Sequence, residues 1–113
     1  RIATSVAQLH AARVDVEIDE GTPPLVNAPE LVELAREAAA MTVGQEHVTR
    51  LTIANMGGED FSYYLDRVPG CYVRIGAQVP GRFPAHCSRF DFDEQALAVG
   101  AAYFANVARL AGS

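Results

Sequence analysis

The sequence predicts an α/β chain in which helices pack on a mainly parallel sheet. Helix-type and strand-type hydrophobic patterns alternate after a proline-rich break at residues 21–24. The strand-type runs are short and bounded by turn residues, as expected for strands. Two loops with candidate functional residues, around Gly57-Gly58 and His86, each follow such a run, and parallel sheets bind ligands at the carboxyl ends of their strands.

Size and composition favour one folded domain. The chain has 113 residues, of which 50% are hydrophobic and 20% are charged. Its net charge is −5, and its nine basic residues are arginines scattered along the chain, which argues against a nucleic-acid partner. The sequence has no apolar run of membrane-spanning length and no leader-like segment, so we expect no membrane contact and a cytoplasmic protein.

The first 20 residues predict a helix followed by a strand. Residues 2–12 place Ile2, Val6 and Leu9 on one side of a helix. Residues 14–19 alternate apolar and acidic side chains, which is the pattern of a strand with one buried face. Gly21-Thr22-Pro23-Pro24 then interrupts regular structure and marks the best candidate for a domain boundary.

A second helix and a second strand are predicted after this boundary. Asn27 is the expected N-cap, Pro29 lies in the first turn, and Gly44 ends the helix. Residues 48–54 alternate as a strand and lead into Gly57-Gly58, where two glycines permit a tight backbone turn.

A short helix and a third strand follow the glycine pair. Glu59 and Asp60 are expected in the first turn of the helix, where the helix dipole favours acidic residues. Pro69-Gly70 stops the helix, and residues 71–76 predict a strand covered on both faces.

The last helix is expected to hold the loop that contains His86. Asp91 is the predicted N-cap, with Glu94 closing a capping box, and the helical spacing continues to about Leu110. An anchored loop suits a metal ligand, and imidazole is a common one. A lone histidine is nevertheless more often an ordinary loop or core residue, and His10 and His47 are interpreted as surface residues.

Other reactive side chains lie near His86 in the sequence. Cys71 and Cys87 form no metal-binding spacing and are expected to be reduced, partly buried thiols, although Cys87 could instead be a thiol at the mouth of a site. Arg82 and Arg89 flank His86, and either one is a candidate to meet a substrate carboxylate.

Three motifs together resemble the carboxy-terminal part of the M20 metallopeptidase family. They are Met56 to Leu65 (MGGEDFSYYL), Pro69 to Gly76 (PGCYVRIG), and His86 followed by Phe90 to Glu94 (FDFDE). The match is nearest to the amidohydrolase branch, which includes hippurate hydrolases and N-acyl-amino-acid amidohydrolases. The resemblance implies that residues 1–20 end an inserted α+β lid or dimerisation domain. Residues 21–113 would then be the carboxy-terminal part of a zinc-peptidase-like catalytic domain.

The resemblance also implies a site. His86 matches the last metal-ligand histidine of a two-metal centre, with zinc, or manganese or cobalt, in the complete protein. Gly57 and Gly58 would allow substrate to approach, while Glu59, Asp60 and Asp91 would support the neighbouring loops. The other ligands and the general-base glutamate are expected upstream of this chain. The sequence departs from the family where Cys87-Ser88 replaces the usual Asn-Pro or Ser-Pro.

The implied reaction is hydrolysis of the amide bond in N-acyl amino acids or small peptides by metal-activated water. The isolated chain is expected to be an inactive fragment that binds no metal tightly, because one imidazole cannot hold two cations. An alternative is a non-catalytic α/β binding or assembly module that forms homo-oligomers through exposed sheet edges. A third alternative uses Cys87 as a nucleophile beside His86, although sequence neighbours rarely have the required geometry.

Overall fold

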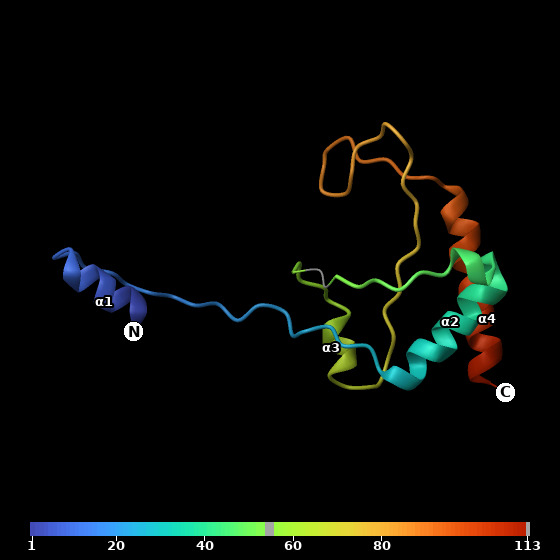
Figure 1. Ribbon diagram of the computed structural model, residues 1–113, viewed down its shortest axis with the longest axis horizontal. Helices are drawn as coiled ribbons and strands as arrows, with labels where there is room; N and C mark the ends of the chain where they lie inside the picture. The colour runs from blue at the N-terminus through green and yellow to red at the C-terminus, as the bar shows by residue number, and fades with distance from the viewer. Residues whose placement is uncertain (54–55, 113) are drawn as a thin grey trace.

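The computed structural model describes residues 1–53 and 56–112. It contains four α-helices and one 3-10 helix within that part of the chain (Figure 1). In chain order these are α1 (Ile2–Leu9), α2 (Pro29–Val43), η1 (Gln45–His47), α3 (Ser62–Leu65) and α4 (Gln95–Ala111).

The predicted α/β sheet is wrong, because no β-strand forms in the described residues. The segments 14–19, 48–53 and 71–76 run without a neighbouring strand, and position 54 of the second predicted strand lies outside the described residues. The sole ladder contact recorded there is an isolated parallel bridge between Phe83 and Phe90. A strand-type sequence needs a partner for its backbone N–H and C=O groups, and these segments have none to complete a ladder.

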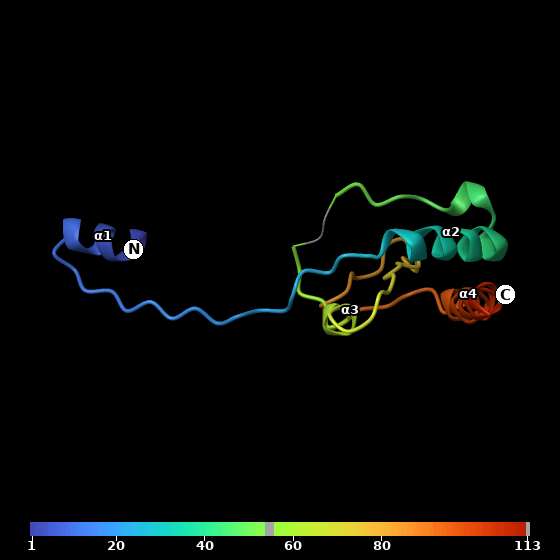
Figure 2. The same cartoon turned by 90° about the horizontal axis from the view of Figure 1, so that it is seen from below.

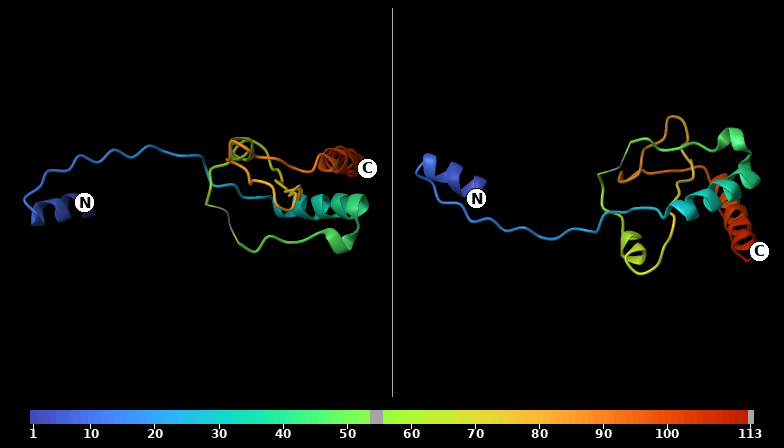
Figure 3. Two further views of the ribbon diagram at one scale, coloured as in Figure 1. Left: turned by 90° about the horizontal axis from the view of Figure 1, so that it is seen from above. Right: turned by 60° about the horizontal axis from the view of Figure 1, so that its bottom comes forward.

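The chain is much more extended than a compact domain. Its radius of gyration is 20.3 Å, with principal extents of 64 × 38 × 21 Å. A compact chain of this length would have a radius of about 13 Å. Figures 2 and 3 show why: α1 and the trace that follows it reach away from the other helices as a long arm.

The best-packed part of the molecule is the contact between α2 and α4, which lie side by side in Figure 2. Ala35 and Ala38 of α2 and Tyr103 of α4 are the buried hydrophobic residues of the described chain. Ala38 has no exposed surface, and its small side chain permits close approach of the two helices. Asn106 Nδ2 donates to Thr42 Oγ1 at 3.0 Å and adds a polar link across this contact.

The start of α2 differs from the prediction. Ala28, not Asn27, is the residue that precedes the helix, and no side chain caps its N-terminus. Pro29 occupies the first turn as expected, and Gly44 ends the helix with φ +88°, in the left-handed region that glycine adopts without strain.

The start of α4 also differs. The helix begins at Gln95, four residues after Asp91, and the predicted capping box does not form. Asp93 instead accepts the N–H of Gln95 through Oδ1 at 2.9 Å, while Asp91 Oδ1 accepts the N–H of Phe92 at 3.0 Å. Asp93, which is closer to the start of α4, thus accepts the free backbone N–H of Gln95. Asp91 lies in the loop that precedes the helix.

The two remaining helices are shorter than expected. α1 ends at Leu9, and α3 spans only four residues, so Glu59 and Asp60 precede the helix instead of lying in its first turn. None of the described helices is both long and apolar enough to cross a lipid bilayer.

Candidate functional site

The loop of residues 77–94, which precedes α4, carries His86 and is tied at its base. The N–H of Asp93 donates to the carbonyl oxygen of Ala77 at 2.9 Å, which brings the two ends of the loop together. Figure 1 shows this segment folded back on itself before α4. Within it, the N–H of Phe90 donates to the carbonyl oxygen of Cys87 at 2.9 Å, and this closes a tight turn directly after His86.

His86 lies on the surface of this loop with φ +68°. A positive φ is uncommon for a residue other than glycine, although histidine is among the side chains that adopt it more often. No hydrogen bond or ion pair to the imidazole occurs in the described part of the chain. The ring is therefore exposed and free to bind, and it is not buried among aliphatic side chains.

The two arginines that flank His86 have different surroundings. Arg82 Nε lies 3.5 Å from Asp91 Oδ2 in an ion pair whose side chains are about half exposed. Arg89 places its guanidinium carbon 3.8 Å from the centre of the Phe83 ring. Contact with an aromatic face holds a guanidinium in place without using its N–H groups.

No metal centre is formed by the described residues. They contain no group of three or more histidine, cysteine, aspartate or glutamate side chains that could hold an ion. His86 thus supplies one donor, and Cys87 beside it is the nearest sulfur in sequence.

The glycine pair lies outside this loop, in the segment before α3. A Cβ atom added at Gly58 would lie 2.9 Å from Thr22 Oγ1, so this glycine allows the boundary segment to pass close to its backbone. Gly57 and Gly58 are both exposed. His86 lies in the separate loop of residues 77–94, and the joint role of these two parts of the predicted site stays a prediction.

Glu59 links the glycine segment to residues 70–72. Its Oε1 accepts the N–H of Phe61 at 3.2 Å, and its backbone oxygen accepts the hydroxyl of the fully buried Ser62 at 2.7 Å. A hydrogen bond from the Tyr72 hydroxyl to the Glu59 carboxylate raises the pKa of Tyr72, because ionising the phenol would lose that bond. Asp60 is exposed at the turn that leads into α3.

The sequence assigned Asn27 the wrong role, as a helix N-cap, and gave no signal for a second structural residue. Asn27 donates from Nδ2 to the carbonyl oxygen of Tyr72 at 3.0 Å and accepts the Tyr72 N–H on Oδ1 at 2.8 Å. The second residue is Ser62, whose side chain is fully buried. The contact between Asn27 and Tyr72 joins residues 45 positions apart, so no local sequence pattern indicates it.

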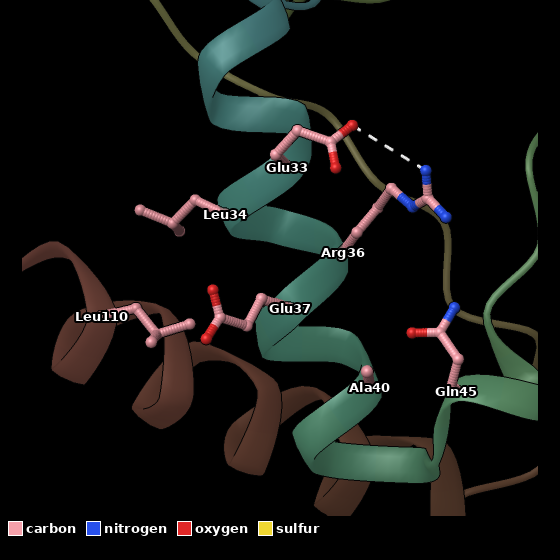
Figure 4. A pocket seen from close by; sticks show the side chains of 7 residues that line it. All are labelled: Glu33, Leu34, Arg36, Glu37, Ala40, Gln45 and Leu110. Atoms are coloured by element: carbon pink, nitrogen blue, oxygen red, sulfur yellow. Dashed lines mark ion pairs between the residues drawn. The ribbon is translucent and has the colours of Figure 1, made fainter.

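Two open hollows lie outside the loop of residues 77–94. An open depression of about 630 Å³ is lined by α2, η1 and the end of α4, and Figure 4 shows the Glu33–Arg36 ion pair at its edge. A smaller depression of about 340 Å³ lies between the start of α2 and residues 65–70. None of the predicted site residues lines either hollow.

Both cysteines are free and half-buried, as predicted. Burial raises the pKa of the Cys71 thiol, because an apolar environment disfavours the thiolate. A raised pKa makes Cys71 a poorer nucleophile at neutral pH.

Comparison with known proteins identifies the class. Residues 3–110 match the peptidase family M20/M25/M40, and this match covers nearly the whole chain. The protein belongs to this family of peptidases and related hydrolases.

The individual relatives have varied names. An N-acetylcysteine deacetylase of Bacillus subtilis (strain 168) is 32% identical over 96% of this chain and 27% of its own length. The IAA-amino acid hydrolase ILR1-like 2 of Arabidopsis thaliana is 29% identical over 95% of this chain and 26% of its length. A protein of Rhodococcus jostii (strain RHA1) that is named as glutamate–cysteine ligase 2-3 is 34% identical over 87% of this chain and 12% of its own length.

The chain therefore spans about a quarter or less of these relatives. No solved structure matches the sequence at a significant level.

Proposed function

We propose that this chain is part of a metal-dependent amidohydrolase that cleaves the amide bond of N-acyl amino acids. The observation that carries the proposal is the family match over residues 3–110, which includes the exposed, unpaired His86. Two of the relatives are named for reactions on N-acyl or amino-acid conjugates, which supports this substrate class over larger peptides. A cytoplasmic location belongs to the same proposal.

The described residues fit a divalent metal in one respect only. His86 can supply a neutral imidazole nitrogen, but this part of the chain offers no further donors around it. A complete centre requires ligands, and a general base, from elsewhere in the protein. A pair of zinc, manganese or cobalt ions would polarise the scissile carbonyl and lower the pKa of water.

The residues of this chain then have three proposed tasks. His86 binds the metal from an anchored loop, and its left-handed backbone directs the chain into the turn that follows. The exposed pair Gly57-Gly58 leaves room for the substrate backbone on the side of Gly58 that Thr22 does not occupy. Glu59, Asp60 and Asp91 hold the adjoining segments, for which the bonds of Glu59 and Asp91 are the structural basis.

The test uses the complete polypeptide that contains this segment. Hydrolysis of the N-acetyl derivatives of alanine, methionine and cysteine, and of N-benzoylglycine, is measured before and after removal of metal with a chelator. His86→Asn is the informative variant, because asparagine tolerates a positive φ and so preserves the loop. His10→Asn, on the exposed end of α1, is the matched control.

We expect chelation to abolish hydrolysis and added zinc to restore it. His86→Asn is expected to reduce both activity and the amount of bound metal, while His10→Asn changes neither. Full activity of His86→Asn, or hydrolysis that survives chelation, would reject the proposal. The 113-residue chain alone is expected to hydrolyse none of these compounds.

A further inference from the structure

Building on the proposed function, we infer that Arg89 binds the free carboxylate of the N-acyl amino-acid substrate and makes the enzyme specific for the acid. Sequence alone leaves Arg82 and Arg89 as equal candidates, because both flank His86. The structure separates them by what each guanidinium contacts.

Arg82 already has a carboxylate partner. Its Nε lies 3.5 Å from Asp91 Oδ2, and this contact connects the two sides of the loop. For Arg82 to bind a substrate carboxylate, it would have to share its charge with Asp91 or break that ion pair. Its structural role therefore competes with ligand binding.

Arg89 has no carboxylate partner among residues 1–53 and 56–112. The Phe83 ring, 3.8 Å from the guanidinium carbon, contacts the cation and limits its freedom. The guanidinium forms no hydrogen bond or ion pair in the described part of the chain, so its N–H groups are available for a bidentate carboxylate. Arg89 is also exposed, so a ligand can reach it.

The backbone keeps Arg89 near His86. Three peptide units separate the two residues, so their Cα atoms are at most about 11 Å apart. The Phe90-to-Cys87 hydrogen bond and the Phe83–Phe90 bridge fold this stretch into a turn against the segment that carries the Phe83 ring. A metal ligand and a positioned cation thus share one short loop.

This arrangement matches the chemistry of an N-acyl amino acid. Such a molecule carries the scissile amide and a free carboxylate on either side of one α-carbon. A cation beside the metal ligand would bind the carboxylate while the amide lies at the metal. In the corresponding primary amide the carboxylate is replaced by an uncharged group, so Arg89 adds no charge interaction to its binding.

The experiment compares acid and amide in the metal-loaded complete polypeptide. The compound of the panel above that is cleaved fastest is paired with its own primary amide. kcat/KM for both compounds is measured with the wild type, Arg89→Gln, Arg89→Lys and the matched control Arg82→Gln. Binding of the deacylated amino acid by calorimetry, and the melting temperature of each variant, accompany the kinetics.

We expect Arg89→Gln to lower kcat/KM for the acid by about 10- to 100-fold, the loss expected for a charged hydrogen-bonded contact, while leaving the amide unchanged. Arg89→Lys should restore part of the loss, and Arg82→Gln should preserve the wild-type preference for the acid. Binding of the amino acid should weaken only in the Arg89 variants.

Three results would overturn the assignment of Arg89. These are an equal loss for acid and amide, an unchanged preference in Arg89→Gln, or the carboxylate-specific loss in Arg82→Gln. Failure of the wild type to cleave any compound in the panel is a separate outcome, because it would reject the proposed function on which Arg89 depends.

Discussion

At the scale of single residues, Asn27 replaces a missing strand partner. Its side chain forms the two hydrogen bonds to the Tyr72 backbone that a neighbouring strand would otherwise form. The adjacent N–H of Ala28 donates to the carbonyl oxygen of Gly70 at 3.0 Å, so three bonds fasten the start of α2 to residues 70–72. This is how the boundary segment is held to the rest of the chain.

Asn27→Ala should release this connection. Both side-chain bonds are lost, at about 1 kcal/mol each, so the Tyr72 amide should exchange its hydrogen about tenfold faster or more. Hydrogen exchange followed by NMR measures the rate, and the amides in the middle of α2 serve as an internal control. An unchanged rate at Tyr72 would show that the Asn27 bonds do not protect it.

Cys71 should make stability depend on alkaline pH. Burial raises the pKa of its thiol above the ordinary value of about 8.5, so unfolding permits an ionisation that folding disfavours. The contribution of the protonated Cys71 thiol to the free energy of unfolding is fully present below the ordinary pKa. It is lost as the pH rises towards the raised pKa of the folded state. The pKa of Tyr103 is raised as well, first by burial and second by the negative charge of the Cys71 thiolate. Ionisation of Tyr103 in the unfolded state therefore adds a further loss of stability at higher pH.

The measurement is the melting temperature of the helical circular-dichroism signal as a function of pH. We expect the melting temperature of the wild type to fall above about pH 8.5 and that of Cys71→Ala to fall only at higher pH. Cys87→Ala is the matched control and should follow the wild type. Identical profiles for Cys71→Ala and the wild type would contradict the role of Cys71.

At the scale of elements, the end of α2 depends on one backbone conformation. Gly44 has φ +88° and its N–H donates to the carbonyl oxygen of Ala40 at 2.9 Å. An added Cβ would lie 2.6 Å from Glu46 Oε1, but that exposed side chain can move away. The cost of a substitution therefore comes mainly from the left-handed backbone.

Gly44→Ala should destabilise the chain by about 1 to 2 kcal/mol, the energy of placing a Cβ in the left-handed region. Urea unfolding followed at 222 nm measures the change. Gly76→Ala is the matched control, since nothing lies within 4 Å of the added Cβ atom at that position. We expect Gly76→Ala to be neutral or slightly stabilising, and equal effects of the two variants would contradict the argument.

The elements also show what could be predicted from sequence. α2 and α4 were found because apolar periodicity and the glycines at positions 44 and 112 are local signals. The start of α4 was misplaced because Asp91 and Asp93 have the same capping chemistry, and only the folded loop determines which one accepts the Gln95 N–H. The prediction of strands was wrong because a ladder depends on partner segments that no local sequence pattern specifies.

The candidate site depends on both local and tertiary features. The sequence resemblance selects His86, which lies within the residues that match the family, and its role as a metal ligand stays a prediction. The contact between Arg89 and Phe83 and that between Asn27 and Tyr72 are tertiary features that require coordinates. The predicted sheet would have brought the strand ends before Gly57-Gly58 and His86 to one edge, and that argument is lost because no strand forms in the described residues.

At the scale of the whole molecule, too little apolar surface is buried. Only three hydrophobic side chains are buried in the described residues, whereas Ile18, Ile53 and Met56 are 84%, 86% and 95% exposed. Exposed apolar surface of this extent favours association. The segment 14–19 adds free backbone donors and acceptors beside an apolar row of Val14, Val16 and Ile18.

The isolated chain should therefore self-associate as its concentration rises, and residues 14–19 should contribute to the contact. Ile18→Lys removes an exposed apolar side chain and places a charge on the edge, so it should reduce association measured by light scattering and sedimentation. Thr49→Lys adds the same charge at an exposed position without removing apolar surface, and should associate as the wild type does. If the wild type stays monomeric over a wide range of concentration, or if the two lysine variants behave alike, the apolar row of residues 14–19 is not an association surface.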